Sequence, residues 1–504
     1  MTLLGHPAGL FLLFLVEMWE RFSYYGMRGL LVLYLVQSAL PGPNPGRGWS
    51  RGEASLLYGW YTGLAYLLPI VGGWVADELL GTHRSMVVGG LLIALGHVVL
   101  AVSGIGSLAS TDAGMSVFVF GLALIVIGTG HFKPCVSVMV GQLYAPHDAR
   151  RDAAFTIFYM GINLGAFLSA FVCGTLGERV GWHWGFGSAA VGMLAGLALY
   201  LTLRRRLLGD IGAPPPGRPN LALPSALVGV ALAALFALLY HAQVLAAVAA
   251  RVPGRAAALV LGALAVAWAV RFVVRLDPPE RGPTATIFVF MLFNAVFWLA
   301  FEQAGSSLNL FTDLRTDRRL DGFDVPTTWF QSVNAGLIFV LAPLFAALWS
   351  RLGRRGRDPR QPVKIALGLA FLALGYVFMV WAGRIAADPA LKAAMIFVLA
   401  TYFWHTVGEL CLSPTGLSYV TKAAPERYVS LLMGVWFIST FLANLGGGLV
   451  ASQVEAIERG EIALPWHLGG QADFFMLFVV SAGAASLLMF ALAPWLARLA
   501  RGVE

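Results

Sequence analysis

Four charged side chains lie within one apolar stretch near the start of the sequence. Residues 10–36 are numerous enough to span a bilayer as a helix, yet they include Glu17, Glu20, Arg21 and Arg28. A charge at the centre of a bilayer costs roughly 2.5 to 3.5 kcal/mol, so ionisable residues there are usually functional. On a helix these four side chains share one face, which must contact protein or water. The stretch therefore predicts a buried functional cluster, with a structural network between helices as the alternative.

Three more ionisable side chains lie well inside apolar stretches, namely Lys133, Glu302 and Glu409. Together with the first cluster they nearly balance in charge, as is expected of groups that pair in a shared cavity. All the buried bases belong to the first half of the chain, whereas the second half supplies only acids. A cavity between the two halves would therefore be positive on one side and negative on the other.

The composition is that of a membrane protein. Hydrophobic residues make up 58% and charged residues 12% of the chain, against about 45 to 50% and about 25% in soluble domains. Apolar segments long enough to cross a bilayer recur along the whole sequence. They are residues 10–36, 54–76, 85–104, 115–142, 153–176, 184–203, 224–247, 255–276, 285–311, 328–350, 363–386, 393–421, 429–453 and 472–497. The sequence thus predicts an all-α integral membrane protein with fourteen transmembrane helices.

A basic, proline-rich linker at residues 204–219 divides the chain after the sixth span. Spans 224–247 and 255–276 carry no charge near their centres and are interpreted as an inserted pair. Six spans then remain on each side, which is the 6+6 plan of the major facilitator superfamily. The predicted domains are an N-terminal six-helix bundle at 1–203, the linker and inserted helices at 204–281, and a C-terminal six-helix bundle at 282–504.

The distribution of Lys and Arg predicts the orientation. An even number of spans puts both termini on one side, and basic residues are more frequent in the loops on that side, as in the run Arg204, Arg205 and Arg206. Both termini are therefore expected in the cytoplasm. The net charge of +8 follows from this topology, so it does not indicate a nucleic-acid partner.

A membrane-embedded enzyme and a channel are two classes to which such a buried charged site could belong. The sequence has no His-rich array, and Cys135, Cys173 and Cys411 lack the spacing of a metal site. A channel ordinarily needs an oligomeric pore-lining repeat, which a single bipolar site does not suggest. We therefore expect neither an enzyme nor a resident metal or cofactor.

Most of the buried charges fall within four separated motifs. These are Glu17-x-x-Glu20-Arg21-Phe-x-Tyr-Tyr-Gly, Phe158-Tyr-Met-Gly-Ile-Asn163-Leu-Gly, Phe301-Glu302 and Gly408-Glu409-x-x-x-Ser413-Pro414. In this order they resemble the signatures of the proton-dependent oligopeptide transporter family, and the two inserted helices resemble its bacterial members. The resemblance implies proton-driven import of di- and tripeptides by alternating access. It further implies a multi-pass protein of the bacterial inner membrane that works as a monomer, with protons as its only co-transported ion.

The resemblance also assigns peptide-binding roles, which the chemistry of the residues permits. The groups for the two ends of the peptide are Arg21, Lys133 and Tyr25 for the carboxylate, and Glu409, Asn163 and Asn334 for the ammonium. The other binding positions are Arg28, Tyr24, Tyr66, Trp298 and Trp436. The aromatic residues could instead serve packing or interfacial anchoring, and the two Asn residues could instead form hydrogen bonds between helices.

Two groups of residues are expected to couple protons to peptide. One is the pair Glu302 and Arg28, in which protonation of the acid would release the base. The other is the cluster Glu17, Glu20, Arg21 and Lys133. Which carboxyl carries the transported proton stays open, because coupled sites titrate together. Nitrate and single amino acids remain alternative substrates, although Glu409 favours a substrate with an ammonium group. Peptide length, side-chain preference, stoichiometry and oligomeric state are left open.

Overall fold

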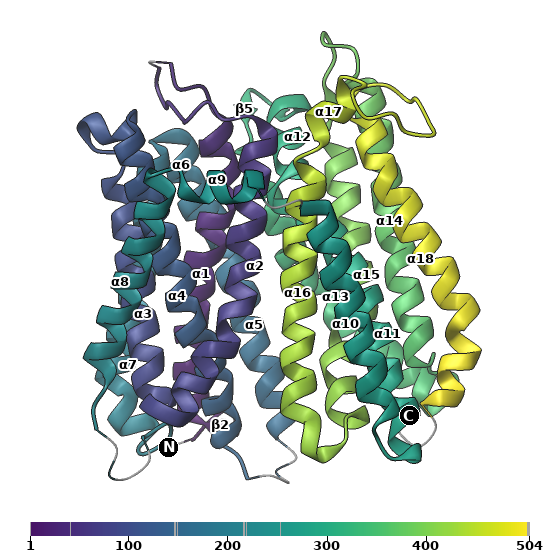
Figure 1. Cartoon of the computed structure of the whole chain (residues 1–504). Helices are drawn as coiled ribbons and strands as arrows, with labels where there is room; N and C mark the ends of the chain where they lie inside the picture. The colour runs from purple at the N-terminus through teal and green to yellow at the C-terminus, as the bar shows by residue number, and fades with distance from the viewer. Residues whose placement is uncertain are drawn as a thin grey trace. The chain divides into compact units, whose positions relative to one another are not determined.

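The structure is a computed structural model, and it describes residues 2–40, 42–145, 148, 150–214, 217, 219–251 and 254–500. The side chains of 249, 250, 254–259, 413–418 and 430 are outside this description, so the Ser413-Pro414 motif is seen only as helical backbone. Pro215, Pro216 and Arg218 of the predicted linker also lie outside the described residues. Helices dominate the rest (Figure 1).

The helices follow the predicted apolar segments closely. They are α1 (Ala8–Val36), α2 (Arg51–Val75), α3 (Thr82–Val102), α4 (Asp112–Gln142), α5 (Arg151–Ser169), α6 (Thr175–Arg179), α7 (Trp182–Leu207), α8 (Ala222–His241), α9 (Val244–Arg251), α10 (Gly254–Val274), α11 (Pro278–Phe301), α12 (Ser307–Arg315), α13 (Trp329–Arg354), α14 (Gln361–Ile385), α15 (Met395–Ala423), α16 (Val429–Ala451), α17 (Val454–Glu458) and α18 (Ala472–Leu499). Two-residue strands occur only between helices or before α1 among the described residues. They are β1 (Thr2–Leu3), β2 (His6–Pro7), β3 (Thr316–Asp317), β4 (Arg319–Leu320), β5 (Phe323–Asp324) and β6 (Ala393–Ala394).

Twelve helices of the described chain are long and apolar enough to cross a membrane. This confirms the prediction of an all-α, multi-pass membrane protein. The twelve include α8. Helix α1 is not among them, because it carries four charged residues. Helix α10 is not among them either, because only its part Val260–Val274 has described side chains and this part is too short. The count of fourteen spans, with two of them inserted, therefore stays a prediction.

The chain forms two compact units that do not follow the order of the helices strictly. The first contains Met1–His241, Ala304–Leu314 and Arg318–Phe339, and the second contains Ala242–Gln303, Arg315–Asp317 and Val340–Glu504. Helix α8 thus belongs to the first unit, where Ala233 joins a cluster with Val88, Leu92 and Leu124 of α3 and α4. The predicted boundaries at 203 and 281 were drawn from the linker rather than from packing, and they stay a prediction.

Glycines let α1 lie close to its neighbours in the first unit. A Cβ atom at Gly165 of α5 would collide with the backbone of α1 at Met18 and Phe22, and one at Gly196 of α7 would collide with Trp19. Small residues at helix contacts are a usual means of close packing in membranes. Helix α1 is therefore enclosed by α5 and α7, which buries most of its side chains.

The span predicted at 285–311 is interrupted in the structure. Helix α11 ends at Phe301, a 3-10 turn follows at Glu302–Gly305, and α12 begins at Ser307. A Cβ atom at Gly305 would collide with the Tyr58 side chain of α2. The turn thus needs glycine where it passes Tyr58, and it leaves Glu302 at the end of a helix rather than in its middle.

The N-terminal end of α13 is held by the carboxylate of Glu178 in α6. Its two oxygens accept hydrogen bonds from the backbone N–H groups of Thr327 and Thr328, each at 2.8 Å, and from the Thr328 hydroxyl at 2.6 Å. Arg318 lies 4.0 Å from the same carboxylate, and its guanidinium also binds Asp313 at 3.0 Å. The first N–H groups of a helix have no partner within it, so Glu178 caps α13 from another helix.

We predict that Glu178→Ala lowers the unfolding free energy by about 1.5 to 3 kcal/mol, because it removes charged hydrogen bonds from helix N–H groups. Glu178→Gln should cost less, since the amide oxygen still accepts one of these bonds. The measurement is the thermal unfolding midpoint in detergent. Glu461→Ala, which removes an exposed carboxylate paired only with Arg459 among the described residues, is the control and should change little. Equal midpoints for Glu178→Ala and the control would contradict the capping role.

Candidate functional site

The Arg21 guanidinium lies between two carboxylates of its own helix. Its Nε atom is 2.9 Å from Glu17 Oε1 and 2.5 Å from Glu20 Oε2, and all three side chains are at most 6% exposed. The i,i+4 spacing on α1 brings Glu17 and Arg21 together directly. The predicted cluster is therefore present, and its charge is one negative in excess before any further cation is counted.

Lys133 of α4 supplies that further cation. Its ammonium lies 3.5 Å from the centre of the Tyr66 ring of α2, and it is close enough to Glu20 to interact electrostatically. A cation over an aromatic face is attracted by the ring's negative face. Helices α1, α2 and α4 thus contribute to one charged group, as predicted for Glu17, Glu20, Arg21 and Lys133.

Arg28 lies two turns along α1 from Arg21 and is held by tyrosines. Its Nε donates a hydrogen bond of 2.6 Å to the Tyr58 hydroxyl, and its guanidinium lies 5.5 Å and 5.9 Å from the Tyr25 and Tyr58 ring centres. Tyr24 faces Arg21 at 5.4 Å and stacks on Tyr61 at 6.4 Å. The predicted tyrosines therefore lie beside the cations of α1.

Tyr58 and Tyr61 were not among the predicted site residues. The signal that could have identified them is the spacing of Tyr58, Tyr61 and Tyr66 along α2, which places three hydroxyl-bearing rings on one broad face of a membrane helix. Their contacts with α1 depend on how the two helices pack, which the spacing alone does not determine.

The two predicted asparagines differ in their surroundings. Asn163 is buried in α5, and its amide donates a hydrogen bond of 3.0 Å to the Tyr159 carbonyl one turn earlier. Asn334 lies half-buried on α13 in the part of that helix that belongs to the first unit. The Asn163 amide oxygen could accept a hydrogen bond from a substrate ammonium.

The second unit contains the remaining predicted residues. Glu302 and Glu409 are 5% and 6% exposed, and Trp436 is 6% exposed. Trp298 is half-buried and donates a hydrogen bond of 3.1 Å to Asn294, one turn earlier on α11. Asn294 is a further residue that the sequence did not single out, and it fixes the direction of the Trp298 ring.

The site residues therefore divide between the two units. The structure brings together the predicted residues of α1, α2 and α4, whereas Glu302 and Glu409 belong to the other unit. The predicted pairing of Glu302 with Arg28 and the predicted use of Glu409 with Arg21 stay predictions. Among the described residues there is no group of three His, Cys, Asp or Glu side chains that could hold a metal ion.

This arrangement suits the binding of a carboxylate. Arg21 and Lys133 are fixed cations in a setting of low dielectric constant, and the Tyr25 hydroxyl can donate a hydrogen bond beside them. Two acids in the same cluster can hold or release protons when an anion arrives. The chemistry that this cluster offers is thus anion binding and proton exchange.

A family model and individual relatives of known sequence point to the same protein family. Residues 83–208 and 275–466 match the POT family. The chain is 37% identical over 471 residues to the peptide transporter YePEPT of Yersinia enterocolitica, covering 90% of this chain and 89% of the relative. It is 34% identical over 457 residues to a di-/tripeptide transporter of Lactococcus lactis subsp. cremoris, covering 87% and 88% of the two chains.

A solved structure is similar over its whole length. It is a mutant of a peptide transporter POT in complex with alafosfalin, with a TM-score of 0.80 and 35% identity. The match covers 100% of this chain and 97% of the other. The likeness thus extends over this whole chain.

We predict that Arg21→Ala lowers the unfolding free energy by about 3 to 5 kcal/mol, because Glu17 and Glu20 are left buried without their main cation. The triple variant Glu17→Gln, Glu20→Gln, Arg21→Gln should regain most of this loss, since it removes the charges together. Unfolding midpoints in detergent at neutral pH test the comparison. A triple variant no more stable than Arg21→Ala would show that charge pairing is not what holds the cluster.

Proposed function

The chain belongs to the POT family, and we propose that it is a proton-coupled symporter that imports di- and tripeptides by alternating access. The observation that carries this proposal is the buried cluster of Arg21 with Glu17 and Glu20, beside Lys133. Such a cluster can bind an anion and exchange a proton in one place. Curated relatives named as peptide and di-/tripeptide transporters support peptides as the cargo.

In this proposal the peptide's two termini are bound by opposite charges. Arg21 and Lys133, with the Tyr25 hydroxyl, hold the carboxylate, and Glu409 holds the ammonium with help from the Asn163 and Asn334 amides. The walls of the site for the peptide's side chains would be Tyr24, Tyr66, Trp298 and Trp436. Because a zwitterionic peptide needs both ends bound, an anion such as nitrate would use only half of these groups.

Glu302 is proposed as a proton-coupling acid, with Arg28 as its partner. The support is a chain of contacts that leads from one to the other. Arg28 bonds to Tyr58, Tyr58 lies against Gly305, and Gly305 ends the turn that begins at Glu302. A charged Glu302 would hold Arg28 and close the outer gate, and a protonated Glu302 would release it.

The proposed setting is the bacterial inner membrane, with both termini in the cytoplasm and a single chain as the working unit. The side with more Lys and Arg in its loops is then cytoplasmic. Protons supply the energy, since each one that enters down 100 mV yields about 2.3 kcal/mol. No other cofactor is part of the proposal, and the relatives are transporters rather than enzymes.

We expect Glu302→Gln to abolish uptake driven by an inward proton gradient while it retains peptide counterflow. The amide resembles the protonated acid but cannot release a proton. Labelled dipeptide uptake into proteoliposomes, with and without a gradient, gives both readouts. Glu280→Gln serves as the control, because Glu280 is an acid of the same helix that pairs with Arg427 at its end. Gradient-driven accumulation by Glu302→Gln near the wild-type level would remove Glu302 from the coupling.

A double cycle of binding affinities tests the two charged poles. For the wild type, acetylating the peptide amine or amidating its carboxylate should each weaken binding by about 1.5 to 3 kcal/mol, the value of a hydrogen bond to a charged group. In Glu409→Ala, acetylation should cost little more, whereas amidation should still weaken binding. Arg21→Ala should show the reverse. Fully additive losses in both variants, measured at one pH, would contradict this assignment.

A further inference from the structure

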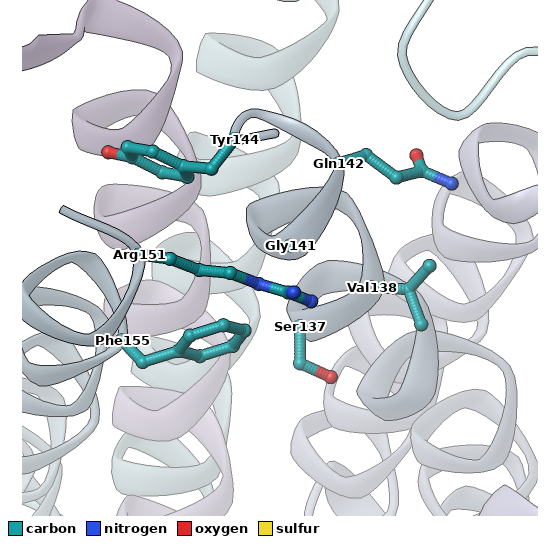
Figure 2. Close-up of a pocket in the computed structure, with 7 residues that line it drawn as sticks. All are labelled: Ser137, Val138, Gly141, Gln142, Tyr144, Arg151 and Phe155. Atoms are coloured by element: carbon teal, nitrogen blue, oxygen red, sulfur yellow. The ribbon is translucent and has the colours of Figure 1, made fainter. Parts of the chain in front are cut away.

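A cavity of about 490 Å³ lies between the end of α4 and the start of α5 (Figure 2). It is lined by Ser137, Val138, Gly141, Gln142, Tyr144, Arg151 and Phe155. The volume is within the range of about 300 to 1,000 Å³ that is usual for small-molecule sites. None of these residues takes part in the binding site proposed above.

Arg151 gives the cavity its charge. Figure 2 shows its side chain extending from α5 toward the last turns of α4, between the rings of Tyr144 and Phe155. Gly141 makes room for it, since a Cβ atom there would lie 3.3 Å from Arg151 Nη2. The preceding residue, Arg150, is instead bound to Asp148 at 2.7 Å and to the Gly5 carbonyl at 2.9 Å. Within the described chain, the Arg151 guanidinium has neither an ion pair nor a hydrogen-bond partner.

The cavity continues the helix face that carries Lys133. Ser137 and Gly141 follow Lys133 at one and two turns of α4, about 6 Å and about 12 Å along its axis. From Lys133 to Gly141, α4 runs toward the end of the first unit at which the N-terminus lies. At that end His6 forms a hydrogen bond of 2.8 Å with the Tyr144 hydroxyl. In the proposed orientation this end is cytoplasmic. A cation and a cavity therefore lie beyond Lys133 on the inward side.

We propose that this cavity is an inner site for the peptide carboxylate, in which Arg151 receives that group after it leaves Arg21 and Lys133. The inference rests on the proposed function. Arg151 can bind a carboxylate through two parallel hydrogen bonds, and the Ser137 hydroxyl can add a third by turning from the Pro134 carbonyl, to which it donates a long bond of 3.3 Å. Tyr144 and Phe155 offer aromatic faces to the C-terminal side chain of the peptide. The same site would receive a peptide that enters from the cytoplasm during efflux.

The test compares Arg151→Gln with Arg150→Gln in right-side-out and inverted membrane vesicles. For dialanine that enters from the inner face, Arg151→Gln should raise KM about tenfold, and dialanine amide should show no such change. Entry from the outer face should keep its wild-type KM within about twofold. Arg150→Gln should behave as the wild type on both faces, and Arg151→Lys should recover part of the loss.

A second variant, Ser137→Val, keeps Arg151 in place and removes only the hydroxyl, so it tests the site if Arg151→Gln folds poorly. It should raise the inner-face KM for dialanine about threefold and leave that for the amide unchanged. Equal effects on the free and amidated peptide, or equal effects of the two Arg variants, would overturn the inner site. An effect of Arg151→Gln seen only in vesicles with phosphatidylglycerol would also overturn it and would indicate a lipid phosphate. Absence of proton-driven uptake by the wild type would instead contradict the proposed function.

Discussion

The burial of the Arg21 guanidinium is the constraint on which the first unit depends. A guanidinium cannot lose its charge inside a membrane, so it must be paired wherever the fold puts it. Glu17 and Glu20 provide the pairing from the same helix, which means that α1 must stay helical through the whole cluster. The neighbouring helices must then exclude lipid from that face. Helix α1 approaches α5 so closely beside Arg21 that position 165 has no room for a side chain, and Gly165 meets that requirement.

Tyrosine is the second recurring partner of the buried cations. Arg21, Arg28 and Lys133 lie over tyrosine rings at 5.4 Å, 5.5 Å and 3.5 Å from the ring centres. A cation–π contact contributes about 0.5 to 2 kcal/mol, which is less than breaking a buried ion pair costs. A cation can therefore leave a ring for an incoming carboxylate at a lower cost than it can leave a buried carboxylate. A site built from carboxylates alone would bind its own cations too firmly to exchange them.

The sequence predicted what helical periodicity determines and missed what packing determines. The contact of Glu17 with Arg21 follows from their i,i+4 spacing, and the apolar segments gave the helices because a bilayer requires long uncharged spans. The break at Glu302 was not predicted, because the apolar run that ends at Phe301 was extended through the largely polar residues 302–307 as one span, and no proline marks the interruption. Its cause is the approach of Tyr58 to Gly305, which is a contact between distant parts of the chain. The same reason explains why Tyr58 and Tyr61 were missed, and why α8 could not be assigned to the first unit in advance.

The Glu178 cap on α13 would make the outward-open and inward-open states of the proposed cycle unequal in energy. It joins α6 to the start of α13 within the first unit, at the end that lies opposite the N-terminus (Figure 1). Moving α6 and α13 apart at that end would leave three donors and a carboxylate to be satisfied by water alone. An empty carrier would therefore rest with its outer side shut. If the proton coupling and orientation proposed above hold, the coupling carboxylates of that idle state would face the cytoplasm rather than the exterior, so the carrier would not dissipate the proton gradient when no cargo is present.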